Sequence, residues 1–83
     1  MTNNKIEVQY LKPILVSHND GILHTVAYNV NVVRSNKDMW LEAIPMNTNK
    51  GVRRVADNEH LLRILLENDL KTYCLQNSVV RHR

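Results

Sequence analysis

The single cysteine and the histidines are the residues of this sequence with the most versatile chemistry. Cys74 would act as a nucleophile only beside a base that removes its proton, and no histidine lies at a spacing from it that recommends such a pair. Its neighbours are largely apolar, which is typical of a small buried side chain rather than a reactive thiol. The only two glycines, Gly21 and Gly51, lie in expected turns rather than in a phosphate-binding loop. We therefore expect no catalytic residues and no enzyme activity.

A metal site would have to draw on the same residue types. Zinc sites usually show close pairs such as C-x-x-C or H-x-x-x-H, and the sequence contains neither. His18 and His24 flank an expected hairpin turn and could approach each other, but a loop histidine and a strand histidine at the sheet rim are the favoured explanation. We therefore expect no metal ion and no cofactor. The remaining candidate ligands are His60, His82 and Cys74.

Length and composition predict one small domain. The chain has 83 residues, 43% of them hydrophobic, and a formal net charge of +3, which is typical of a single globular unit with one modest core. We expect residues 1–83 to form that domain, with frayed ends at about 1–4 and 79–83. No apolar run approaches the ~18 residues of a membrane span, and the first residues lack the apolar stretch of a signal peptide. Together with the single cysteine, these features predict a cytoplasmic protein.

Two alternating segments separated by a short turn predict a β-hairpin. Residues 5–16 alternate between apolar and polar side chains, and Pro13, which has no backbone donor, indicates an edge strand or a bulge. The turn that follows contains Gly21, which supplies the positive φ that a hairpin loop of this length requires. Residues 22–33 form the strongest predicted strand, and their even-numbered side chains are expected to face the core.

Residues 39–44 predict a third strand, but the alternation does not settle which of its faces is buried. Either Leu41 lies inside with Trp40 outside, or the reverse holds. A polar turn and a short run at residues 52–55 follow, and they allow a fourth strand.

Four leucines at helical spacing predict one helix that begins at Asp57, a suitable N-cap residue. We expect it to end near Asn68, because asparagine takes the left-handed conformation that closes helices, and residues 71–75 would then form a last short strand. The alternative is a helix that continues to about Asn77. The fold class is therefore α+β: an antiparallel sheet of three to five strands with one α-helix, at about 57–68, packed on one face. The leucines are Leu61, Leu62, Leu65 and Leu66.

The lack of clustered chemistry and the long strands predict a binding protein. Exposed sheet edges recruit partner strands, and Trp, Tyr and Arg often carry interface energy. We expect a small inhibitor or regulator that binds a larger protein partner and acts by occlusion; a homodimer through a sheet edge fits the same features. Asparagine, with eleven copies, suggests an AT-rich genome and fits a bacterial, phage or viral origin; with the small size and the lack of catalytic groups, we expect a phage or mobile-element accessory protein. The candidate partner-binding residues are Trp40, Arg53, Arg54 and Tyr28.

A mildly basic nucleic-acid-binding domain is the alternative function. Residues 51–83 carry six basic and four acidic side chains, and basic groups neutralise phosphates. The acidic residues interleave with the basic ones, however, as they do on an ordinary solvated helix face. The candidate residues for this function are Arg53, Arg54, Arg63, Lys71, Arg81 and Arg83.

Overall fold

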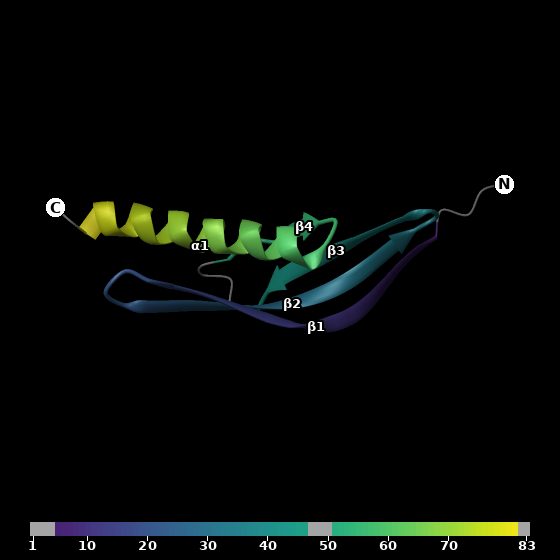
Figure 1. Cartoon of the computed structure of the whole chain (residues 1–83), viewed down its shortest axis with the longest axis horizontal. Helices are drawn as coiled ribbons and strands as arrows, with labels where there is room; N and C mark the ends of the chain where they lie inside the picture. Colours follow the sequence, from purple (N-terminus) through teal and green to yellow (C-terminus); the bar gives the residue numbers. More distant parts are fainter. Residues whose placement is uncertain (1–4, 47–50, 82–83) are drawn as a thin grey trace.

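The chain folds into one four-stranded antiparallel sheet with a single helix on one face (Figure 1). The computed structural model describes residues 5–46 and 51–81, with side chains as far as residue 77. This architecture confirms the predicted α+β class, with a sheet of three to five strands and one helix. The strands, in their order across the sheet, are β1 (Ile6–Asn19), β2 (Leu23–Ser35), β3 (Asp38–Pro45) and β4 (Arg54–Ala56), and the helix is α1 (Glu59–Arg81).

The turns that join the first three strands use the residues that their backbone requires. Gly21, in the β1–β2 turn, has a φ of 104°, as predicted. Asn36, in the β2–β3 turn, has a φ of 53°, and asparagine tolerates that left-handed conformation better than most residues. The short turns explain why β1, β2 and β3 are sequential neighbours in the sheet, and β1 lies at its edge, as Pro13 indicated.

A register shift in β1 divides its apolar side chains between the two faces of the sheet. The pairing with β2 is regular except between Tyr10 and Lys12, where β1 carries one extra residue, Leu11. Because side chains alternate along a strand, one extra residue sends the side chains before and after it to opposite faces. Ile14 and Val16, which follow the shift, face the helix and are buried. The apolar side chains that precede the shift face away from the helix: Ile6, Val8 and Tyr10.

The helix is longer than predicted, and the expected strand at residues 71–75 does not form. One side chain in every four along α1 is buried, and this stripe continues without a break through Asn68, the residue that we expected to close the helix. The longer alternative, to about Asn77, is therefore nearer to the structure; α1 continues to Arg81, within the predicted frayed end at 79–83. The other predicted frayed end, 1–4, lies outside the described residues. The stripe consists of Leu62, Leu66, Leu70 and Cys74.

Asn58, rather than the predicted Asp57, caps the start of α1. The Asn58 side-chain oxygen accepts a hydrogen bond from the backbone N–H of Leu61 at 2.9 Å, which satisfies one of the unpaired donors of the first turn. Glu59 follows at the first helical position, where its negative charge interacts favourably with the helix dipole. Within the described part of the chain, no helix combines the length and the apolar character needed to cross a membrane.

Ion pairs fasten the helix to both edges of the sheet. Lys12, in β1, places its Nζ 2.6 Å from Glu59 Oε1, and Arg63 Nε donates to the other oxygen of the same carboxylate at 3.1 Å. At the opposite edge, Arg54, in β4, donates two hydrogen bonds of 2.8 Å to the carboxylate of Asp69. Such a two-pronged pair fixes orientation as well as distance.

Substitution of Lys12 should change how Glu59 titrates. Hydrogen bonds from Lys12 and Arg63 lower the pKa of Glu59 below its ordinary value of 4.5. The interaction therefore stabilises the fold above that pH and is lost as the pH falls through the lowered pKa. We expect an NMR titration of the Glu59 carboxyl to give a midpoint below 4.5, and Lys12→Met to raise it. Lys71→Met, a matched loss of charge on the same helix, should leave it unchanged; an equal rise in both variants would contradict the pairing.

Candidate functional site

The sheet face opposite the helix carries a contiguous set of apolar side chains. Val8, Val33 and Trp40 are register partners on three adjacent strands and therefore form one row on this face. Ile6 and Tyr10 lie on the same face, on either side of Val8 along β1. We call these five residues, Ile6, Val8, Tyr10, Val33 and Trp40, the open-face patch.

The side chains of the open-face patch are largely accessible to a partner. Val8 is 58% exposed and Tyr10 is 56% exposed, whereas Val33, between Val8 and Trp40 in register, is only 5% exposed. The patch therefore has exposed apolar side chains at its margin and a close-packed centre. Exposed apolar side chains that become buried on association form the cores of binding interfaces.

The patch lies at an end of the sheet that projects beyond the helix (Figure 1). The projection makes the molecule long, with extents of 60 × 21 × 20 Å and a Cα radius of gyration of 15.5 Å, whereas a compact domain of this length has a radius of about 12 Å. Its accessible surface of 6089 Å² exceeds the approximately 5,100 Å² that is typical of a monomer of this mass. More surface is thus left open to solvent than a chain of this size ordinarily exposes.

The structure settles the two faces of β3. Leu41 and Ala43 are buried beneath the helix, whereas Trp40 is partly exposed on the open face and is not part of the core. The structure thus has Leu41 inside and Trp40 outside, which is the first of the two arrangements that the sequence allowed. Trp40 is consequently accessible from the open face.

The other three candidate partner-binding residues do not gather around Trp40. Tyr28 is completely buried beneath the helix, so a partner cannot reach it in this fold. Arg53 lies beside the open face, where its Nε donates to Glu42 at 2.6 Å. Arg54 points to the helix side and pairs with Asp69. Sequence reasoning grouped the two arginines because they are adjacent, but their ion pairs lie with different elements, Glu42 in β3 and Asp69 in α1.

The basic residues of the nucleic-acid alternative are largely paired with carboxylates. Arg53, Arg54 and Arg63 each form an ion pair within the chain, with Glu42, Asp69 and Glu59 respectively. A phosphate would have to compete with these carboxylates, which weakens the alternative. Of the remaining candidates, Lys71 is exposed on α1, Arg81 ends the helix with a side chain that is not described, and Arg83 lies outside the described residues.

A second apolar surface lies beside the start of the helix. It is an open groove of about 430 Å³ between β4 and α1. The groove adjoins the short edge strand β4, and an exposed sheet edge can pair with a strand of a partner. It is lined by Val55, Ala56, Asp57, Leu61, Ile64 and Leu65.

Sequence reasoning did not assign Ile6, Val8 and Tyr10 to a binding surface. Their alternation correctly predicted a strand, but their even numbers place them on the same face as Ile14 and Val16 unless β1 contains a bulge. Pro13 gave the only signal of that bulge. No protein-family model matches this chain, and comparisons with curated proteins and with solved structures likewise found no match.

Proposed function

We propose that this chain is a non-enzymatic binding protein that recognises a larger protein through its open-face patch and acts by occlusion. The observation that carries the proposal is the row of Val8, Val33 and Trp40 on the face opposite the helix, at whose edge Val8 is 58% exposed. A contiguous exposed apolar patch on a small protein marks a site for a macromolecular partner. Trp and Tyr, both present, are the residues that most often dominate such interfaces.

The pairing of the basic side chains within the chain favours a protein partner over nucleic acid. The paired arginines argue against nucleic acid, because an electrostatic interface needs basic groups that are available to phosphates. An accessory inhibitor or regulator of a phage or mobile element is the form of this function that agrees with the small size and the abundant asparagine.

Affinity capture from the lysate of the native host tests the proposal. We expect a protein to be retained by the wild-type chain after nuclease treatment and to be retained poorly by Tyr10→Ala. Binding of the purified partner to Tyr10→Ala should be weaker by a factor of about ten or more, because truncation of an interface tyrosine commonly costs ≥ ~1–2 kcal/mol. Tyr10 is an exposed residue on an edge strand, so its loss should leave the fold intact.

Two matched variants show which surface is responsible. Leu75→Ala removes an equally exposed side chain from the outer side of the helix, and we expect it to bind like the wild type. Ile64→Ala removes a side chain from the groove beside β4. Loss of binding in Ile64→Ala alone would move the interface to that groove, and loss of capture on nuclease treatment would support nucleic acid. Either result contradicts the proposal.

A further inference from the structure

The β1–β2 turn and the C-terminal half of the helix bring together three side chains of different metal-binding chemistry. His18 lies near the end of β1, Asp20 lies in the turn, and Cys74 lies on the buried stripe of α1. One ligand atom from each residue, a ring nitrogen, a carboxylate oxygen and the sulfur, lies within 4.8 Å of the other two. Because Cys74 is distant in sequence, the fold alone creates this cluster.

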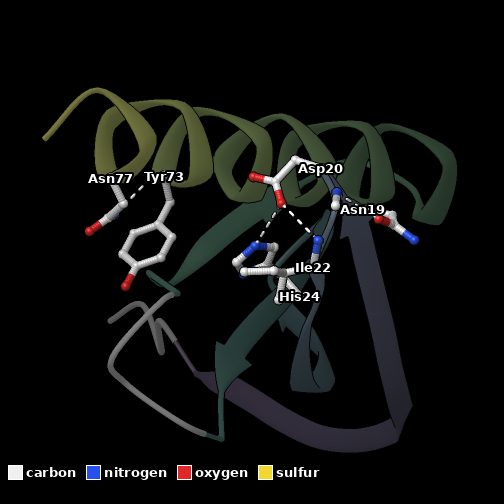
Figure 2. Close-up of polar contacts among 7 residues, drawn as sticks. Asn19, Asp20, Ile22, His24, Tyr73 and Asn77 are labelled. Atoms are coloured by element: carbon white, nitrogen blue, oxygen red, sulfur yellow. Dashed lines mark hydrogen bonds and ion pairs between the residues drawn. The ribbon is translucent and has the colours of Figure 1, made fainter. Parts of the chain in front are cut away.

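His24, on the neighbouring strand β2, makes a hydrogen bond to Asp20 of the cluster. It is the register partner of His18, so both histidines lie on the helix side of the hairpin. Its Nε2 lies 3.1 Å from Asp20 Oδ1, and Figure 2 shows the Asp20 carboxylate directed toward His24 and the backbone of Ile22. In metal sites, a hydrogen bond of this kind fixes the orientation of a carboxylate ligand. The bond from His24 uses only Oδ1 of Asp20, so the other carboxylate oxygen can bind a metal ion.

We infer that His18, Asp20 and Cys74 form a binding site for Zn²⁺, with His24 as the residue that positions Asp20. Thiolate, imidazole and carboxylate are the ligand types that zinc uses, whereas Mg²⁺ and Ca²⁺ prefer oxygen ligands alone. Three protein ligands leave the fourth tetrahedral position to water. The three ligands lie around the boundary between the core and the solvent, because Cys74 is buried and Asp20 is exposed.

The separations require only a small closure of the site. Zinc–ligand bonds of about 2.0–2.3 Å place tetrahedral ligand atoms about 3.3–3.6 Å apart, compared with the present upper limit of 4.8 Å. Asp20 is exposed and His18 is half-buried, so rotation of these two side chains can supply the difference. Cys74 is 3% exposed and is held by the core. The cation compensates the thiolate and the carboxylate, whose negative charges are costly at the edge of an apolar core.

A buried thiol favours metal binding over catalysis at this place. A nucleophilic cysteine must be reached by its substrate, and Cys74 lies beneath the hairpin. A bound ion would instead join the β1–β2 turn to α1 and so stabilise the fold, because zinc bound only by the folded state shifts the folding equilibrium. The site lies at the opposite end of the sheet from the open-face patch (Figure 1). The metal site and the proposed partner interface therefore use different residues, and each can be tested without the other.

Cobalt substitution tests the site on the full-length chain. Addition of Co²⁺ to the reduced, metal-free protein should produce a near-ultraviolet charge-transfer band from thiolate to cobalt, which saturates at one equivalent and disappears on addition of Zn²⁺. Zn²⁺ should also raise the midpoint of thermal unfolding. The absence of the band in the wild-type protein at one equivalent would overturn the inference.

Variants locate the binding to these residues. His18→Gln and Asp20→Asn, at accessible positions that do not threaten the core, should lower the Zn²⁺ affinity measured against a chromophoric chelator by more than 100-fold, and Cys74→Ala should abolish the cobalt band. His24→Gln should weaken binding by about 10- to 100-fold, as expected of a residue that orients a ligand. His60→Gln, an exposed histidine on the same helix, is the matched control and should bind like the wild type. Equal loss in His60→Gln, or unchanged affinity in His18→Gln, would overturn the inference.

Discussion

Leu70→Ala is expected to destabilise the protein by about 3 kcal/mol, because it empties a fully buried leucine site between the helix and the sheet. Leu70 is 1% exposed and belongs to the hydrophobic core cluster. A chain of this size has a modest total stability, so the variant should be largely unfolded at moderate urea concentrations. Equilibrium urea unfolding, followed by far-ultraviolet circular dichroism, measures the effect.

Leu75→Ala is the matched control for this substitution. It makes the same chemical change five residues further along the same helix, but at a side chain that is 61% exposed. We expect a change within about 0.5 kcal/mol, as for most exposed positions. Similar losses for both variants, or a loss below about 1 kcal/mol for Leu70→Ala, would show that the helix beyond Asn68 is not packed on the sheet.

The same comparison explains why the helix end was wrongly predicted. Local preference favoured a stop at Asn68 followed by a strand, because Thr72, Tyr73 and Cys74 are mediocre helix formers. That preference amounts to at most about 0.7 kcal/mol per residue. Burial of Leu70 alone is worth roughly 1.5–3 kcal/mol, and Cys74 adds to it on the same stripe. The apolar spacing that continues to Cys74 can be read from the sequence. The free energy gained by burying these side chains exceeds the free energy lost through their poor helix propensity.

The candidate binding face could not be predicted in the same way. Ile6, Val8 and Tyr10 share their parity with Ile14 and Val16, so a regular strand would place all five on one face. The extra residue at Leu11 reverses that arrangement, and a bulge is set by pairing with another strand rather than by the bulged residue itself. The strand was predictable from alternation, whereas the face that each half of it presents depends on the whole sheet.

The ion pairs were likewise invisible to sequence reasoning. The partners of Arg53 and Arg54 lie in β3 and α1, so the charge available to a phosphate depends on tertiary contacts. The cluster at the hairpin turn has the same origin: proximity of His18 and His24 followed from the predicted hairpin, but the approach of Cys74 required the longer helix. Composition and spacing therefore predicted the sheet and the helix, apart from the strand expected at residues 71–75, whereas packing determined which side chains meet.

Gly51→Ala is expected to destabilise the protein by about 1–3 kcal/mol, the usual cost of an added methyl group in a close-packed site. A Cβ atom at Gly51 would lie 2.9 Å from Tyr28 Oη, 2.9 Å from Pro45 Cβ and 3.2 Å from Val26 Cγ1. These distances are shorter than van der Waals contact, and the tyrosine cannot move aside because it is completely buried. Gly21→Ala makes the same change where nothing lies within 4 Å; its cost would come from the positive φ alone, so it separates backbone strain from crowding.

Tyr28→Phe should reduce the cost of Gly51→Ala, and this coupling tests the packing directly. The Tyr28 hydroxyl is buried without a hydrogen-bond partner among the described residues, and a buried hydroxyl of that kind carries an uncompensated desolvation cost of roughly 1–3 kcal/mol. Tyr28→Phe alone is therefore expected to be neutral or stabilising, and it also removes one of the two atoms nearest to the new Cβ. In a double-mutant cycle measured by urea unfolding, Gly51→Ala should cost at least about 0.5 kcal/mol less in the Tyr28→Phe background. Pro45 remains in place, so the rescue should be partial. Additive effects would show that the Cβ atom added at position 51 does not press against the hydroxyl. A loss of more than about 1 kcal/mol in Tyr28→Phe alone would show that the hydroxyl makes a hydrogen bond.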